Sequence, residues 1–384
     1  MRRSSAILVL LFVAALAAHG GLVYAALAKP GSSVFFDAEV VRGRGCDFYA
    51  LYTAGHNLRH GRSVYDEGPA AVKTPCRFGF RYLPVAAAAG VPLSFLSPRA
   101  AYKTWILLIE LAFVAGLYCV WLLARKNASA FVPLAAVWLV FTPMYLELRL
   151  GQYSLVQAVL VTIAATAYRS GANRLGTGFF TASLCFKLNT WLAAPALLRE
   201  RRKEPLLIGA AILAATSIPH FLIFPDSIAS FVGNLGTASV SAAHGFTRGN
   251  LSLSMLAGIV WPRAFSATVV NAIFVLVVAA GCVTALRSKK MDLADQLAFW
   301  LALSLLAYKH TWEHHYVMAL PLITLLALRG RTIAFWIGTA LLAMPTPYYF
   351  FRGSWTPFEQ FVHHGQKPIG LIILLVAMLM ARKG

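Results

Sequence analysis

Long apolar segments follow one another along almost the whole sequence, and this pattern restricts the fold more than any other feature. Hydrophobic residues make up 59% of the 384 residues, and the mean hydropathy is +0.68. Charged residues amount to 12%, whereas soluble domains carry about 25%. A helix that crosses a bilayer needs roughly 20 apolar residues, and a backbone in lipid must satisfy its own hydrogen bonds. The sequence therefore predicts an all-α polytopic membrane protein.

Basic clusters indicate how these segments are oriented. The net charge is +20, but Lys and Arg stand mostly at the ends of apolar segments, as expected where cytoplasmic loops carry an excess of cations. We therefore expect no nucleic-acid partner. If the basic clusters face the cytoplasm, both termini are cytoplasmic. We then expect 1–384 to form a single domain in the plasma (inner) membrane, with about 12 transmembrane or re-entrant helices. The expected spans are 6–28, 101–124, 131–148, 153–168, 205–223, one ending at Arg287, 294–309, 316–328, 332–346 and 367–381.

Residues 176–198 are the exception to simple crossing. This segment begins and ends beside basic clusters, so a single span is ruled out, and we expect two half-helices that meet near 187–189 with Lys187 at the turn. Such a hairpin is tolerated only when it packs against protein. An ionisable residue at membrane depth is costly and usually functional, although a lysine can also snorkel to the surface.

The first apolar segment is followed by a long extracytoplasmic loop, 29–100. That segment resembles a signal peptide, but it stays apolar to Leu27, which favours an uncleaved helix. Within the loop, residues 82–96 form a short apolar element that we expect to lie in or dip into the outer leaflet. Cys46 and Cys76 share the loop and can pair if it faces an oxidising compartment. The sequence leaves their pairing open.

Acidic and histidine side chains gather on the predicted outer face. Most of the 14 acidic residues and the histidines of 310–315 and 363–364 fall there, so we expect the chemistry at that surface. Asp47 begins a predicted amphipathic helix that ends at Gly61. Its carboxylate either caps this helix or acts in catalysis, and the spacing alone leaves both roles open.

Other polar positions also have two interpretations. Arg81 can bind a phosphate group or ordinary lipid headgroups. Gln152 stands at a predicted helix start, where its side chain can face a cavity. His314 and His315 belong either to an interfacial polar belt or to a site. Adjacent histidines project in different directions from a helix and no zinc-binding motif is present, so we expect no metal.

Five short motifs occur in order between residues 46 and 315. They are Cys46-Asp47-Phe48-Tyr49 with Tyr65-Asp66, Phe80-Arg81-Tyr82-Leu83-Pro84, Gly151-Gln152-Tyr153-Ser154-Leu155, Phe186-Lys187-Leu188-Asn189 and Thr311-Trp312-Glu313-His314-His315. In this ordered set the chain resembles glycosyltransferase family 87, whose members are polyprenyl-phosphate-sugar-dependent enzymes of the GT-C membrane superfamily. No single motif is specific.

The resemblance implies a GT-C fold and an inverting sugar transfer. The donor is a mannose-type or arabinofuranose-type sugar on a polyprenyl phosphate, and the acceptor is a lipid or a glycan. Asp47 acts as general base, cations stabilise the leaving phosphate, and no cofactor is required. The expected substrate-binding residues are Tyr49, Arg81, Tyr82, Gln152, Lys187, Arg248, His314 and His315.

Two other functions compete with this hypothesis. A transporter or flippase of lipid-linked sugars is expected to show paired repeats with broken helices at matching positions, and no such repeat is evident. A non-catalytic membrane scaffold would use the outer polar cluster to bind lipid. Only an enzyme has a strict need for Asp47.

Overall fold

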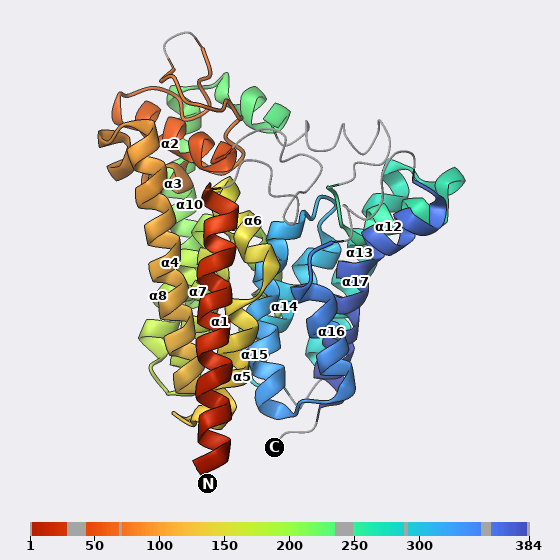
Figure 1. Ribbon diagram of the computed structural model, residues 1–384. Coiled ribbons are helices and arrows are strands. Elements are labelled where there is room, and N and C mark those ends of the chain that lie inside the picture. The colour runs from red at the N-terminus through yellow and green to blue at the C-terminus, as the bar shows by residue number, and fades with distance from the viewer. Residues whose placement is uncertain are drawn as a thin grey trace.

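The computed structural model describes residues 2–28, 44–68, 71–234, 249–287, 291–346 and 355–381. Within these ranges the regular structure is helical, and β pairing is limited to an isolated bridge between Asn250 and Trp312. The helices stand roughly side by side in a bundle, with a small layer of short helices at one end (Figure 1). We call this end, which carries α2, the α2 end.

Five of the described helices are long and apolar enough to cross a membrane. They are α1 (Arg2–Ala28), α4 (Pro98–Leu123), α10 (Glu204–Ile223), α13 (Ala267–Arg287) and α17 (Pro357–Met380). Two consecutive helices, α5 (Ala128–Leu139) and α6 (Thr142–Leu150), pass the same test together although they are bent by 48°. The protein is thus a polytopic membrane protein, and the expected number of about 12 transmembrane or re-entrant helices stays a prediction.

Shorter helices fill the space between these spans. They are α7 (Ser154–Arg169), α8 (Asn173–Phe186), η5 (Leu188–Ala193), α9 (Ala194–Arg199), α12 (Leu253–Val260), η6 (Pro262–Ala264), α14 (Leu293–Ala307), η7 (Glu313–Ala319), α15 (Leu320–Arg329) and α16 (Ile333–Ala343). Among these, α14 is buried along its whole length. It forms the centre of the bundle.

Helix α1 lies at the edge of the bundle, and only 6% of its apolar window is buried. It starts at the end opposite α2 (Figure 1). Halfway along it, the Nε2 atom of His19 lies 3.3 Å from a carboxylate oxygen of Glu110 in α4. The Nδ1 atom of His19 lies 2.9 Å from the hydroxyl of Tyr145 in α6. Polar contacts between apolar helices favour association, so His19 helps to attach α1 to the bundle.

The layer at the α2 end is made from the long loop after α1. It contains α2 (Cys46–Arg59), α3 (Pro84–Ala87), η3 (Ala88–Gly90) and η4 (Pro92–Phe95). Helix α2 ends as expected, with Gly61 in the left-handed region at φ 66°. The apolar element predicted at 82–96 folds as three short helices that pack on α2. The approach is close, because a Cβ atom on Gly55 would lie 2.2 Å from the backbone of Gly90.

Helices α8 and α9 form the hairpin that the sequence predicts. At its tip, the Nζ atom of Lys187 donates a hydrogen bond of 2.6 Å to the Oγ atom of Ser154, where α7 begins. After α9, the guanidinium of Arg202 lies over the ring of Tyr168, 5.1 Å from its centroid, where α7 ends. The chain therefore climbs alongside α7, turns at Lys187 and returns to the level at which it started.

One segment differs from the expected spans because of proline. The segment 131–148 is not one helix, since α5 ends at Leu139 and α6 starts again at Thr142, one residue before Pro143. Proline disfavours the helical conformation of the residue before it and lacks an N–H group. The break bends α6 across the bundle and brings its C-terminal end beneath α2.

The C-terminal helices also differ from the prediction. Helix α14 ends at Ala307, so the histidines of 310–315 do not end that helix; they lie on an extended stretch and in η7, which leads into α15. Helix α17 begins at Pro357 instead of residue 367, because Thr356 and Glu359 form a capping box. The predicted outer turn that held His363 and His364 is therefore helical, and both histidines are buried.

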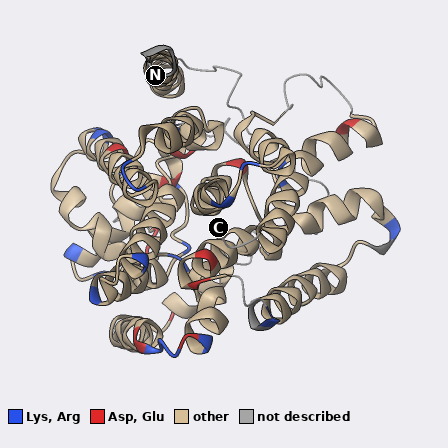
Figure 2. Ribbon diagram, turned by 90° about the horizontal axis from the view of Figure 1, so that it is seen from below, with Lys and Arg blue, Asp and Glu red and all other residues tan. Residues whose placement is uncertain are grey.

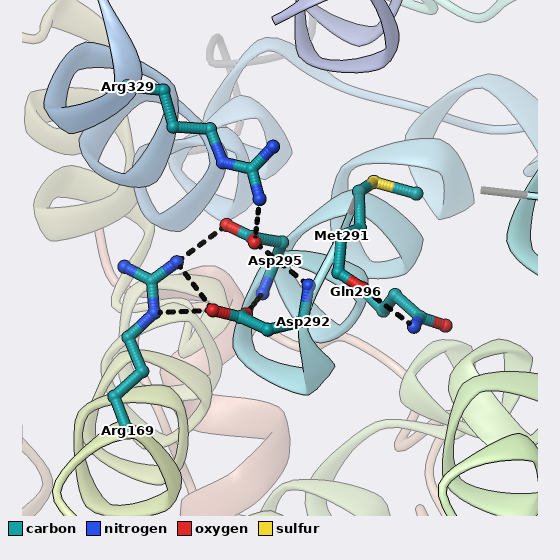
Figure 3. A network of polar contacts seen from close by, with 6 residues as sticks. All are labelled: Arg169, Met291, Asp292, Asp295, Gln296 and Arg329. Carbon is teal, nitrogen blue, oxygen red and sulfur yellow. Dashed lines mark hydrogen bonds and ion pairs between the residues drawn. The ribbon is translucent and has the colours of Figure 1, made fainter. Parts of the chain in front are cut away.

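An ionic network joins three helices at the end opposite α2 (Figure 3). Arg169 of α7 reaches Asp295 Oδ1 at 2.7 Å and Asp292 Oδ2 at 3.1 Å. Arg329 at the end of α15 pairs with the second oxygen of Asp295. Viewed from this end, Lys and Arg lie mainly at helix ends and in turns (Figure 2), as the sequence analysis expects of the cytoplasmic face.

Candidate active site

The start of α7 collects polar groups from several other elements. The side-chain amide of Gln152 donates to Asp47 Oδ2 in α2 over 3.2 Å. Ser154, two residues later, accepts the hydrogen bond from Lys187. The backbone N–H of Leu155 donates to Glu147 Oε1 in α6 over 2.8 Å. The first N–H groups of a helix lack intrahelical partners and carry partial positive charge. The Glu147 carboxylate is therefore stabilised by the start of α7, whereas the Asp47 carboxylate is held by the Gln152 side chain.

Asp47 does not occupy the N-cap of α2. That position belongs to Gly45, which has a left-handed φ of 75° and provides no side-chain cap. Asp47 lies in the first helical turn, half-buried, with its carboxylate beside Gln152. Of the two roles that the sequence left open, the interpretation as N-cap is wrong.

The turn between α6 and α7 holds α2 in place through its backbone. The N–H of Gly45 donates to the carbonyl of Arg149 over 2.9 Å, and the indole of Trp105 donates to the carbonyl of Gly151 over 2.8 Å. Gly151 has a φ of 67°, and a Cβ atom there would lie 2.5 Å from the Cβ of Phe48. Only glycine fits both the conformation and the space, and this close contact brings Asp47 within reach of Gln152.

Tyr82 completes a short polar chain with Gln152 and Asp47. Its hydroxyl oxygen lies 3.1 Å from the amide nitrogen and 3.3 Å from the amide oxygen of Gln152, and its ring centroid lies 4.8 Å from that of Tyr153. Burial, reinforced by the nearby Asp47 charge, raises the pKa of Tyr82. The hydroxyl therefore stays protonated and orients the amide that contacts the carboxylate.

Glu147 is a site residue that the sequence analysis did not single out. Its side chain is fully buried, and Lys187 is 9% exposed. The Lys187 ammonium lies within electrostatic range of both Glu147 and Asp47. A useful signal was present in the sequence, because Glu147 is a lone acid in an apolar segment just before Gly151 and Gln152.

The two adjacent histidines of η7 have different surroundings. His315 Nδ1 accepts a hydrogen bond of 3.1 Å from the backbone N–H of Trp312, so one of its nitrogens stabilises the local turn. His314 is 4% exposed, and neither of its ring nitrogens has a hydrogen-bond partner in the described part of the chain. Both imidazoles lie within electrostatic range of Lys187. His314 is thus available to a bound group.

Arg81 lies farther out than the residues around Gln152. Its guanidinium stacks on the ring of Phe78, 4.4 Å from the centroid, and it is close enough to His310 and Tyr308 to affect their ionisation. Burial, together with the charges of Lys309 and Arg81, lowers the pKa of His310 to about 4. Its imidazole is therefore neutral at pH 7, and Arg81 brings a positive charge to this side of the site.

Two predicted substrate-binding residues are not brought to this cluster. The ring of Tyr49 packs against Phe48 and Tyr102, with centroids at 5.4 and 6.0 Å, and its hydroxyl is within electrostatic range of Arg99. Arg248 lies outside the described residues. No group of three or more His, Cys, Asp or Glu residues that could hold a metal is found in the described ranges.

A disulfide joins Cys46, which precedes Asp47, to Cys76 across a sequence separation of 30 residues. We expect the double variant Cys46→Ser/Cys76→Ser to lose about 2–4 kcal/mol of stability, as a disulfide across a loop of this length provides. Its transfer rate should also fall, because the first turn of α2 loses an attachment. Thermal unfolding in detergent and a transfer assay measure both effects.

Cys282→Ser is a suitable control for this disulfide variant because Cys282 is a free thiol in α13. Unchanged thermal stability in the double variant, or an equal effect in Cys282→Ser, would contradict a stabilising role for the disulfide.

Comparison with protein families identifies a match over much of the chain. Residues 80–309, more than half of the chain, match the sequence model of glycosyltransferase family 87. The matched range contains Arg81, Tyr82, Gln152 and Lys187. Asp47 precedes this range, and His314 lies shortly after it. No curated protein matches the sequence.

Proposed function

The chain belongs to glycosyltransferase family 87, and we propose that it transfers a mannose-type or arabinofuranose-type sugar from a polyprenyl phosphate to a lipid or glycan acceptor. The reaction takes place at the extracytoplasmic face of the plasma membrane, and the whole chain serves as one catalytic domain. The lipid tail of the donor lies between helices, and membrane lipids surround the bundle.

The observation that carries this proposal is the contact between Asp47 and Gln152 beside Lys187 and His314. The half-buried Asp47 carboxylate lies within electrostatic range of the Lys187 ammonium. Lys187 in turn lies within electrostatic range of His314, whose ring nitrogens have no partner in the described residues. A carboxylate can remove a proton from an attacking hydroxyl, and cations or hydrogen-bond donors can stabilise negative charge on a leaving group. Sugar transfer from a phosphate needs these two functions.

The proposed reaction transfers one glycosyl group and one proton. Asp47 accepts the proton of the acceptor hydroxyl while that oxygen forms a bond to the anomeric carbon. The bond between this carbon and the phosphate oxygen breaks, its electrons stay on the phosphate, and the configuration inverts. Glycoside hydrolases use a second carboxyl group as acid, but a phosphate monoester, with a second pKa of about 6, leaves as an anion. Lys187, His314 and Arg81 stabilise it.

Two features support an extracytoplasmic site. The disulfide between Cys46 and Cys76 lies at the α2 end, and disulfides persist in oxidising compartments. The network of Arg169 and Arg329 lies at the other end of the bundle, where cytoplasmic cations are expected.

The test uses the full chain in liposomes that contain a radiolabelled polyprenyl-phosphate sugar and a mixture of envelope glycolipids as acceptors. Donors carrying mannose and donors carrying arabinofuranose are assayed separately. We expect label in a glycolipid or glycan with the anomeric configuration opposite to that of the donor. Movement of intact donor across the bilayer without a new glycosidic bond would instead identify a flippase, and retention of configuration would exclude direct attack assisted by Asp47.

A further inference from the structure

Glu147 combines complete burial with an oxygen that is not used for structure. Its Oε1 atom accepts the N–H of Leu155 and so caps α7. Its Oε2 atom has no hydrogen-bond partner among the described residues. A cap requires only one acceptor oxygen, and burying a whole carboxylate is costly unless a charge compensates it.

The compensating charge is Lys187. Its Nζ atom donates to Ser154 Oγ and lies 5.1 Å from the centroid of the Tyr153 ring, so the ammonium is held directly above the first turn of α7. Glu147 and Lys187 interact electrostatically. They come from α6 and from the tip of the α8–α9 hairpin, two elements that are separated in sequence.

We propose that Glu147 is a positioning residue that keeps Lys187 charged and directed at the phosphate of a lipid-linked donor. This inference rests on the proposed function, because it assigns a role in binding the leaving group of that reaction. It adds a residue to the site and specifies what the residue acts on.

A second carboxylate is needed because Asp47 cannot serve as the permanent partner of Lys187. When Asp47 takes the proton of the acceptor it becomes neutral, at the moment when negative charge grows on the phosphate. Glu147 takes no part in this proton transfer, because its side chain is fully buried and its Oε1 atom accepts the N–H of Leu155. The attraction between Glu147 and Lys187 therefore persists while Asp47 acts as base.

Kinetics of purified full-length protein in liposomes test this role. We expect Glu147→Gln to lower kcat by about 100-fold, the loss typical for one electrostatic contact to developing charge, and to leave the KM for the acceptor unchanged. In a Lys187→Met background the same substitution should cost less than about 3-fold, since the residues act together. Glu147→Asp should restore part of the rate.

A purely structural cap predicts a different pattern. Glu147→Gln would then lower the rate by the same factor with and without Lys187, in step with a lower melting temperature, and this result would overturn the proposal. Glu110→Gln is the matched control, because it removes a carboxylate that pairs with His19 of α1 and not with Lys187. It should change stability without changing kcat.

Binding of polyprenyl phosphate itself, measured by its effect on the melting temperature, separates this inference from the proposed function. Weaker binding in both Glu147→Gln and Lys187→Met supports the positioning role even if the wild-type protein transfers no sugar. Undiminished binding in Glu147→Gln overturns it even if transfer is observed.

Discussion

Replacing Asp47 by Asn is expected to lower the rate of sugar transfer by about 10³-fold or more, near the upper limit of what a positioned general base provides. Asparagine has almost the same shape and can still contact Gln152, so α2 should keep its position. It cannot accept a proton from the attacking hydroxyl. The loss should therefore appear in kcat, with little change in the KM for the donor.

Two measurements make this prediction decisive. The melting temperature of Asp47→Asn should stay within a few degrees of the wild-type value, which shows that the site is still assembled. Glu67→Gln removes an exposed carboxylate from the same loop and should keep nearly full activity. If Asp47→Asn transfers sugar at the wild-type rate, another group is the base and the proposed mechanism is wrong.

The second large effect concerns stability at the opposite end of the bundle. The Asp295 side chain has no exposed surface and pairs with Arg169 and Arg329, as Figure 3 shows. Asp295→Asn removes the carboxylate that pairs with Arg329 and leaves Arg169 with the half-exposed Asp292 alone, and breaking a buried ion pair costs about 3–5 kcal/mol. We expect a marked fall in the melting temperature and in membrane abundance, with a normal kcat for the molecules that remain folded.

Asp292→Asn is the natural comparison for this prediction. Asp292 also contacts Arg169, but its side chain is 46% exposed. Water can therefore solvate Arg169 after the substitution, and the loss of stability should be much smaller. Equal destabilisation by the two substitutions would mean that burial of the Asp295 carboxylate is not what makes the network important.

Much of the site could be predicted from sequence because its residues are exceptions to the pattern around them. Lys187 interrupts an apolar segment between basic clusters, which indicated both the hairpin and its tip. Gln152 follows Gly151, a glycine of the kind that commonly ends a helix, and in the structure Gly151 does end α6. Such local signals can be recognised in the sequence without knowledge of the fold.

Other features depend on contacts that sequence spacing does not encode. Glu147 looked like one of several outer acids, and only the bend between α5 and α6 places it under the start of α7. The helix that contains His363 was expected to start later, because Lys367 and its polar neighbours do not resemble a span. In the structure, Lys367 is buried and lies 3.3 Å from Glu313 Oε1, so pairing across helices replaces solvation by water.

The first turn of α7 has a practical consequence for engineering. Because Gln152, Ser154 and Leu155 each bind a group from a different element, an exchange of single residues between related enzymes will mismatch their partners. A graft that moves 147–155 together with the hairpin tip keeps these contacts intact. The disulfide-linked layer that carries α2 can then be exchanged as a second module.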